Sequence, residues 1–337
     1  MTEQNVAADG AVGGERATTS GGVAADDVLA RTEVVLVSYK SRGHVEELLA
    51  SWPRGLRVVL VDNARGGDGL AELADARPEV RYLDGGGQGF ARGANLGAFS
   101  SEADALVFVN PDSRPTADDL RALVGGLEAD PISVSHAATV AGPDGEVEIG
   151  VGGWEPSVTR TALYAAGLHK IWPRAGVYAK PRRGEALAVQ WTTGACMAVR
   201  TAQFRRLGGF DEAFFVYCED MSFGRRARRA GLRQVLRADV VVPHGAGSSG
   251  APSSEMLRLR GASFANYVER YHPGLPARLM RAAMMAGYVA RATQKAVQGD
   301  PTTSGLHRAM VSGLASRRAF VAGDEVARAR FEETARA

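Results

Sequence analysis

Cysteine, net charge and long apolar runs are all scarce in this sequence of 337 residues. The two cysteines, Cys196 and Cys218, are too few for a disulfide framework and fit a reducing cytoplasm. A single disulfide between them is the alternative that the sequence leaves. A net charge of +2 gives the whole chain no nucleic-acid signature. Because no apolar run is long enough, the sequence predicts neither a signal peptide nor a transmembrane helix.

The N-terminal segment, residues 1–31, is rich in Gly, Ala, Thr, Asp and Glu and contains no apolar signal-peptide region. We expect it to be a disordered arm. Hydrophobic residues make up 45% of the chain, which is enough for one large domain with a core or for two smaller domains.

Strand-like and helix-like segments alternate through residues 33–130. The apolar, β-branched segments predicted as strands are 33–39, 57–62, 80–83 and 105–110. Residues 90–99 can form a helix despite their glycines, and Thr116 with Asp119 predicts a capped helix start. This alternation predicts a mostly parallel sheet with helices on both faces, which binds ligands at the carboxyl ends of its strands.

Polar residues lie at those carboxyl ends. They are Tyr39, Asp62 with Asn63, the glycine cluster 85–89, and Asn110-Pro111-Asp112. The Asp62 carboxylate can accept hydrogen bonds from a nucleobase or a ribose, or it can form an Asx turn, and the two interpretations are even. The glycine cluster lacks the G-x-G-x-x-G spacing of a dinucleotide-binding fold. With Arg92 it can let a phosphate or sugar approach, but a flexible turn is favoured for the glycines alone.

Asp112 is a candidate metal ligand. A carboxylate at a strand end suits Mg²⁺ or Mn²⁺, which in turn bridges phosphates. Since only one carboxylate is present in this segment, the site must also use phosphate oxygens, water or a distant residue. A plain Pro-Asp turn explains the same residues.

A second group of candidates follows the aromatic segment that ends at Cys218. Glu219 and Asp220 are adjacent acids, which are costly in an apolar setting unless they are paired or face a site. One of them can serve as a general base, and both can also begin a helix, where acids complement the dipole. His244 stands before a Gly- and Ser-rich loop, which favours a ligand role over a core role.

Two further regions give weaker predictions. In residues 131–190 strands are predicted at 134–140 and 146–151. Residues 257–295 are rich in Lys and Arg. Their longer apolar side chains at helical spacing are Met280, Met284, Met285 and Tyr288. A helical tail packed on the domain is favoured for this region, and docking on an anionic membrane surface is the alternative.

In their order along the chain these segments resemble glycosyltransferase family 2, the inverting GT-A enzymes, and within it the bacterial rhamnosyltransferases. The resemblance covers roughly residues 33–272. The motifs that carry it are VVLVSYK, LVDN, GGGQGFARGANLGA, VFVNPDS, TGACMAVR, GGFDEAFFVYCED and PHGAGSS. Each motif is a weak signal, and their shared order is a specific one.

The resemblance implies an α/β fold of the GT-A type, with a Rossmann-like mixed sheet flanked by helices. It implies a nucleotide-sugar-binding half at residues 32–130 and an acceptor-binding, catalytic half at 131–255. A basic, helical C-terminal extension is expected at 256–337.

The resemblance also implies roles for individual residues. The donor-binding residues would be Tyr39 and Asp62 at the nucleobase, then Arg92, Asn95, Asn110 and Asp112. Asp112 would bind a divalent metal, Mg²⁺ or Mn²⁺, and His244 would complete the metal or diphosphate site. Asp220 would be the catalytic base, with Glu219 beside it.

The sequence is therefore interpreted as a cytoplasmic, metal-assisted, inverting glycosyltransferase, peripheral at the inner face of the membrane if the basic region docks there. The expected donor is dTDP-L-rhamnose, then other dTDP- or UDP-sugars, and the acceptor a glycan, a lipid-linked glycan or a metabolite. Lys40 and Ser222 depart from the family's commoner Asn and Asp. These departures keep open a catalytically silent sugar-nucleotide-binding or assembly-partner protein, while a nucleotidyltransferase ranks lower.

Overall fold

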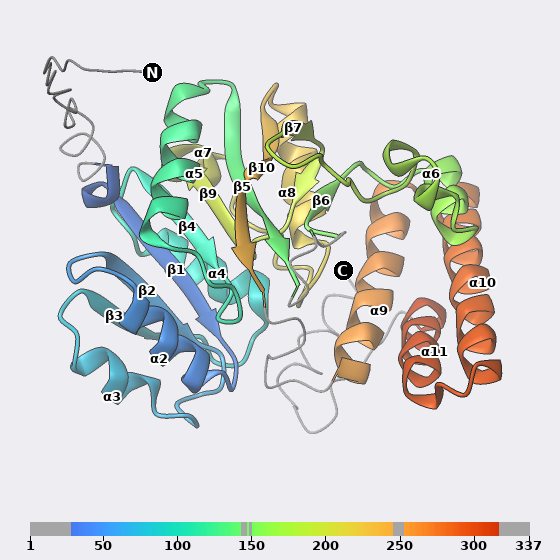
Figure 1. The fold of residues 1–337 in the computed structure, drawn as a ribbon, viewed down its shortest axis with the longest axis horizontal. Coiled ribbons are helices and arrows are strands. Elements are labelled where there is room, and N and C mark those ends of the chain that lie inside the picture. The colour runs from blue at the N-terminus through green and yellow to red at the C-terminus, as the bar shows by residue number, and fades with distance from the viewer. Residues whose placement is uncertain (1–27, 143–146, 148–149, 245–252, 317–337) are drawn as a thin grey trace, which may run out of the picture.

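The computed structural model describes residues 28–142, 147, 150–244 and 253–316. An eight-stranded sheet dominates this part of the chain, with a two-stranded sheet beside it (Figure 1). The large sheet contains β1 (Thr32–Ser38), β2 (Arg57–Asp62), β3 (Val80–Asp84), β4 (Ala105–Val109), β5 (Ser133–Ala141), β7 (Ala186–Val189), β9 (Cys196–Arg200) and β10 (Arg233–Pro243). The small sheet pairs β6 (Gly152–Gly153) with β8 (Trp191–Thr192).

The strand order is β3-β2-β1-β4-β9-β5-β10-β7. The first four run parallel, so their carboxyl ends meet at one edge of the sheet. β9 lies antiparallel between β4 and β5, and β10 pairs parallel with β5 and antiparallel with β7. This mixed, mostly parallel sheet confirms the predicted α/β fold class.

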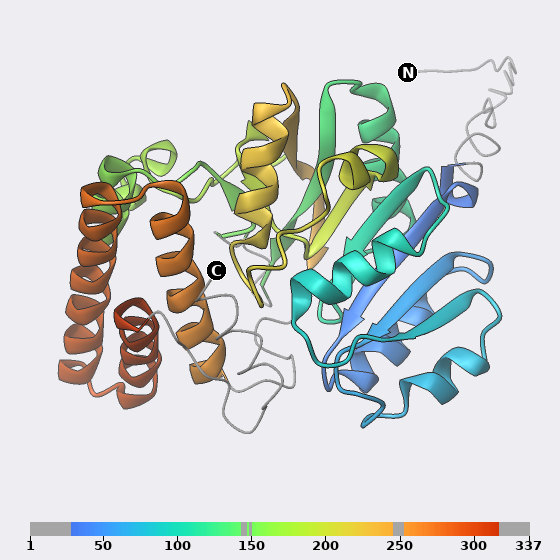
Figure 2. The ribbon, with the colours of Figure 1, turned by 180° about the vertical axis from the view of Figure 1, so that it is seen from behind.

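Helices cover both faces of the sheet (Figures 1 and 2). One layer contains α2 (Arg42–Ser51), α3 (Leu70–Asp75) and α5 (Ala117–Ala129); the other contains α4 (Phe90–Phe99), α7 (Thr201–Arg206) and α8 (Glu219–Arg229). Successive residues of β1 serve the two layers in turn, because Val34 and Leu36 pack in one core and Val35 and Val37 in the other. Burial on both faces explains why this strand is a continuous apolar run.

A group of helices stands beside the sheet, on the side of β10 rather than of β3 (Figure 1). It contains α6 (Val158–Ala165), the short 3₁₀ helices η1 (Leu168–Lys170) and η2 (Pro173–Ala175), α9 (Ser253–Tyr271), α10 (Leu275–Val297) and α11 (Pro301–Ala315). One apolar core joins α9, α10, α11 and Tyr164 of α6 to Trp191, Phe214 and Met221. Met280 and Met284 are buried in that core, which confirms the packed-helix interpretation for these two residues.

Most predicted elements between residues 32 and 142 are confirmed, with ends shifted by one residue. The helix at 90–99 forms as predicted, and Thr116 and Asp119 make the reciprocal bonds of a capping box at the start of α5. The strand predicted at 134–140 is β5, whereas the one predicted at 146–151 lies partly outside the described residues.

The sequence predicts a disordered arm at residues 1–31. Most of the predicted arm 1–31 lies outside the described residues, but Leu29 within it is buried in the core under β1, so the last residues of that arm are folded. Burial of an apolar side chain next to a strand stabilises the folded state by more than the conformational entropy that a disordered segment would keep.

Among the described helices, none combines the length and the apolar character that a membrane span requires. Cys196 and Cys218 are buried, free thiols, so they form no bridge with each other.

Candidate active site

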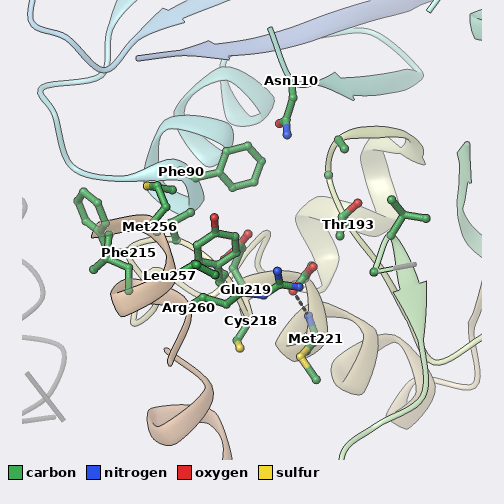
Figure 3. A pocket seen from close by; sticks show the side chains of 18 of the residues that line it. Phe90, Asn110, Thr193, Phe215, Cys218, Glu219, Met221, Met256, Leu257 and Arg260 are labelled. Carbon is green, nitrogen blue, oxygen red and sulfur yellow. Dashed lines mark hydrogen bonds between the residues drawn. The ribbon is translucent and has the colours of Figure 1, made fainter. Parts of the chain in front are cut away.

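A cavity of about 540 Å³ lies where the carboxyl ends of β1, β2 and β4 face the start of α8 and the side of α9 (Figure 3). The predicted site residues that line it are Tyr39, Asn110, Asp112, Glu219, Asp220 and His244. Figure 3 shows Asn110 on the sheet side of this cavity and Glu219 with Arg260 on the helix side. The fold therefore brings residues that are more than a hundred positions apart in the sequence to one cavity.

Asp112 and His244 form the polar corner of the cavity. Asp112 Oδ1 and His244 Nε2 are 3.4 Å apart, and both side chains are largely buried. The pairing of Ser113 with His244 as an isolated antiparallel bridge holds the two segments together. One carboxylate and one imidazole fit a divalent cation that takes its other ligands from phosphate oxygens and water. Within the described part of the chain, no cluster of three or more metal-ligating side chains exists.

Glu219 and Asp220 are the first two residues of α8, and both line the cavity while being buried. Burial raises the pKa of Asp220 to about 6, against the opposing effects of a hydrogen bond from the Met221 amide and of the Arg260 charge. Burial, and then the negative charge of Asp220, raise the pKa of Glu219 well above its usual range. A carboxylate with a pKa near 6 is a stronger base than an ordinary one and remains mostly ionised at neutral pH.

The backbone before these acids adopts an uncommon conformation. Tyr217 and Cys218 have φ angles of 66° and 70°, although neither residue is glycine. Two successive residues in the left-handed region cost of order 1–3 kcal/mol each and occur where a structure overdetermines the chain, often at functional sites. Here they turn the chain so that α8 begins at the cavity with both acids in its first turn.

Three predicted donor-binding residues do not line the cavity. The Asp62 carboxylate accepts hydrogen bonds from the amides of Ala64 and Gly66, at 2.6 and 2.7 Å, and from the Tyr82 hydroxyl. The structure thus shows Asp62 in the Asx-turn interaction, which is one of the two equally weighted interpretations from the sequence. Donation from a nucleobase to Asp62 stays a prediction.

Asn95 and Arg92 lie on α4 and face the loop that precedes the acids. The Asn95 amide donates to the Phe210 carbonyl at 2.8 Å and accepts from the Phe210 amide at 2.7 Å. Arg92 is half-exposed and lies 3.9 Å from Glu212. In this structure both residues support the 210–212 turn, and a direct contact with the donor stays a prediction.

The glycine cluster packs against the segment that leads to the acids. A Cβ atom at Gly89 would lie 2.3 Å from the Phe215 carbonyl oxygen, and the φ angle of Gly89 is 91°. The Phe90 amide donates to that same carbonyl at 2.8 Å. Gly89 is therefore required for the close approach of the two loops, and Gly87 and Gly89 both line the cavity.

Sequence reasoning missed Arg260, which reaches the cavity from α9. Helical spacing alone marks it as one of several basic residues on a long helix, and nothing in the sequence indicates which of them faces the acids. Ser222, by contrast, does not line the cavity: its hydroxyl lies 2.7 Å from that of Tyr271 and 3.3 Å from the Asp211 carboxylate. The departure at Ser222 thus concerns packing behind the helix.

Comparison with known proteins agrees with this geometry. The family model described as glycosyl transferase family 2 matches residues 34–196. The chain is 30% identical over 264 residues to the N-acetylglucosaminyl-diphospho-decaprenol L-rhamnosyltransferase of Mycobacterium tuberculosis, covering 72% of this chain and 85% of the relative. It is 24% identical over 212 residues to the rhamnosyltransferase WbbL of Escherichia coli K12, covering 59% of this chain and 78% of that one.

A solved structure supports the fold. The mannosyltransferase PcManGT from Pyrobaculum calidifontis, determined in complex with GDP-Man and Mn²⁺, superposes with a TM-score of 0.54 at 17% identity. The match covers 85% of this chain and 86% of that one. With the strand order, the cavity and the sequence relatives together, the chain belongs to glycosyltransferase family 2.

Proposed function

We propose that this chain transfers a sugar from a nucleotide-sugar donor to an acceptor hydroxyl, with inversion at the anomeric carbon. Asp220 removes the proton from the hydroxyl, whose oxygen bonds to the anomeric carbon as the bond to the nucleoside diphosphate breaks. The observation that carries this proposal is that Asp220 and the Asp112–His244 pair line one cavity. A base and a diphosphate-binding corner facing one space are what in-line displacement needs.

A divalent cation, Mg²⁺ or Mn²⁺, would be held by Asp112 and His244 and would neutralise charge on the departing diphosphate. Asn110 and Tyr39, which also line the cavity, would contact the donor from the sheet side. Glu219, with its raised pKa, is protonated more readily than an ordinary carboxyl and would leave Asp220 as the ionised member of the pair.

The relatives support the finer assignment of substrates. Two of them are named rhamnosyltransferases, so we propose L-rhamnose from dTDP-L-rhamnose as the first donor to test, followed by other dTDP- and UDP-sugars. The mycobacterial relative is named for a lipid-linked acceptor, which supports a lipid-linked glycan as the first acceptor here. We place the reaction in the cytoplasm, where free thiols such as Cys196 and Cys218 persist.

Binding and turnover of two variants test this function. Nucleotide binding is measured by calorimetry with dTDP and UDP, with and without Mn²⁺, and turnover with dTDP-L-rhamnose and a prenyl-diphosphate-linked N-acetylglucosamine. We expect Asp220→Asn to lose about 10²–10⁴ in kcat while the nucleotide Kd stays within about twofold, because only the base is removed. Asp112→Ala should weaken metal-dependent nucleotide binding and turnover together.

Near wild-type turnover in Asp220→Asn would show that another group is the base. If the folded wild-type chain bound no nucleotide at all, the catalytically silent alternative would replace the enzyme. Nucleotide binding that does not depend on Mn²⁺ would contradict the metal role of Asp112 and His244 and leave the transfer itself in place.

A further inference from the structure

Arg260 brings a positive charge from the C-terminal helices into the cavity. Its guanidinium lies over the ring of Tyr217 at 5.6 Å and over the ring of Tyr178 at 5.7 Å, and it donates to the Tyr178 hydroxyl at 3.3 Å. Cation–π contacts of this kind hold the guanidinium in place without neutralising its charge. Burial raises the pKa of the Tyr178 phenol, so that hydroxyl stays neutral.

Arg260 differs from its neighbours in having no carboxylate partner within the described residues. Arg258, two positions earlier, pairs with Glu255 at 3.1 Å, and Arg281 of α10 pairs with Glu269. Among the residues that the structure describes, no carboxylate oxygen lies within 4.0 Å of the Arg260 guanidinium, although Asp220 is near enough to be affected by its charge. A guanidinium at the wall of a largely apolar cavity is stabilised when a further anion joins it there.

The C-terminal helices also contribute apolar side chains to the wall of this cavity. Leu257 and Phe264 contribute from α9, Met284 from α10 and Met310 from α11. Figure 3 shows Leu257 beside Arg260, on the side of the cavity away from Asn110. Flexible Met side chains and aromatic rings can pack around an aliphatic chain of irregular shape.

We propose that Arg260 binds a phosphate group of the acceptor, and that the apolar part of the cavity beside it receives the hydrocarbon chain attached to that phosphate. This inference rests on the proposed sugar transfer and deepens it. The acceptor class is an amphiphile with a phosphate or diphosphate between its sugar and a prenyl-like chain. Arg260 is then a binding residue for the acceptor, and the donor diphosphate is held at the Asp112–His244 corner.

Binding of simple probes tests the assignment without knowing the natural acceptor. The full-length chain is first saturated with dTDP and Mn²⁺, so that the donor site is filled, and is then titrated calorimetrically with farnesyl diphosphate. Farnesol tests the chain without the anion, and inorganic diphosphate tests the anion without the chain. We expect farnesyl diphosphate to bind more tightly than either of them.

Two substitutions on one helix make the comparison specific. Arg260→Gln should raise the Kd of farnesyl diphosphate about tenfold or more, as expected for loss of a charge-assisted hydrogen bond, and leave the Kd of farnesol and of dTDP within about twofold. Arg258→Gln, which removes a cation paired outside the cavity, should leave all three within about twofold. If Arg260→Gln fails to fold, Arg260→Lys should still weaken farnesyl diphosphate by about threefold or more, because it loses the planar fork.

Unchanged affinity for farnesyl diphosphate in a folded Arg260 variant would overturn the assignment. An upward shift of the midpoint of the pH–rate profile in that variant, with unchanged affinity for farnesyl diphosphate, would also overturn the assignment. Arg260 would then act only by lowering the pKa of Asp220. A loss of dTDP affinity as large as the loss for farnesyl diphosphate would assign Arg260 to the donor instead. Wild-type binding of dTDP, measured in the first step, reports separately on whether the proposed transfer reaction holds.

Discussion

Asp220, the proposed base, is buried, so its charge costs stability. In the unfolded chain an Asp carboxyl has a pKa near 3.8, whereas burial raises it to about 6 in the folded protein. Between about pH 4 and pH 6 the folded protein therefore keeps a proton that the unfolded chain has released. Stability falls as pH rises through this window, because the folded state binds more protons there.

This linkage predicts that Asp220→Asn stabilises the protein at neutral pH. The gain should be roughly 1–3 kcal/mol at pH 7.5 and should shrink towards zero near pH 4, where the wild-type carboxyl is protonated in the folded state. Asn keeps an oxygen that accepts from the Met221 amide, so the helix start is preserved. Urea unfolding followed by circular dichroism, in EDTA and without nucleotide, measures the difference.

Asp118→Asn is the matched control for that experiment. Asp118 is also an acid in the first turn of a helix, α5, but its side chain is 90% exposed. Its removal should change stability by no more than about 0.5 kcal/mol, and in the opposite direction. A destabilised Asp220→Asn at pH 7.5 would mean that the carboxylate is solvated or paired, and that its pKa is not raised.

Individual site residues differed in how far the sequence could predict them. Asp112, Glu219, Asp220 and His244 reach one cavity as expected, because each follows or ends a segment whose direction the apolar pattern reveals. The turn bonds of Asp62 are local and match one of its two predicted alternatives, whereas Asn95 bonds to Phe210, 115 positions away, which no local pattern reports. The presence of Ser rather than Asp at position 222 is explained only by the folded structure, because an Asp there would place a second carboxylate against Asp211.

Among the elements, α9 and α11 make the closest helix contact. A Cβ atom at Gly313 of α11 would lie 1.9 Å from the Arg258 carbonyl oxygen of α9, and one at Gly261 would lie 2.4 Å from the Met310 carbonyl oxygen. Both clashes involve backbone atoms, which cannot rotate away. The two glycines therefore set the distance between the helices, and with it the position of Arg260 and of Met310 in the cavity wall.

We expect Gly313→Ala to destabilise the protein by about 2 kcal/mol, the cost of forcing a methyl group into a packed interface. Gly305→Ala on the same helix should stabilise it by about 0.5–1 kcal/mol, because nothing lies within 4 Å of that position and alanine is the better helix former. Thermal unfolding of both variants gives the comparison. Equal, raised melting temperatures would show that the helices are not in contact at Gly313.

The sequence predicted elements well where strands are long and apolar, and poorly in residues 152–192. The strands β6 and β8 have only two residues each, and β7 has mostly exposed or half-buried ones. Elements of this size hold no complete period of any hydrophobic pattern. They form because Trp154, Glu155 and Trp191 make long-range contacts, which appear only once the chain is folded.

At the scale of the whole molecule, α10 presents an exposed apolar face. Leu275, Leu279, Val289 and Val297 are exposed along α10, whereas Met280 and Met284 of the same helix are buried. The face that can meet a bilayer is therefore the outer side of α10, with the exposed Arg278 available to anionic headgroups. Membrane contact through this face is our proposal for how the chain reaches a lipid-linked acceptor.

Co-sedimentation with vesicles checks this contact. The full-length chain should bind vesicles containing phosphatidylglycerol, bind pure phosphatidylcholine less, and release as salt rises. Replacing Leu279 and Val289 together by Glu should lower the bound fraction about threefold or more. Ile132→Glu, at an exposed apolar position on the turn before β5, should leave it unchanged. Absence of binding to the anionic vesicles would remove the membrane from the proposal.

Part of the cavity wall comes from one continuous stretch of chain: Arg260 and six apolar residues between Met256 and Met310 lie in the C-terminal helices, whereas the proposed donor-binding residues Tyr39, Asn110 and Asp112 precede them. Such a division makes the protein suited to recombination between relatives. A chimera that joins residues 1–252 to the C-terminal helices of another family member should keep its own nucleotide preference and acquire the acceptor range of the second parent. Selection on the acceptor can then act on one contiguous segment of the gene.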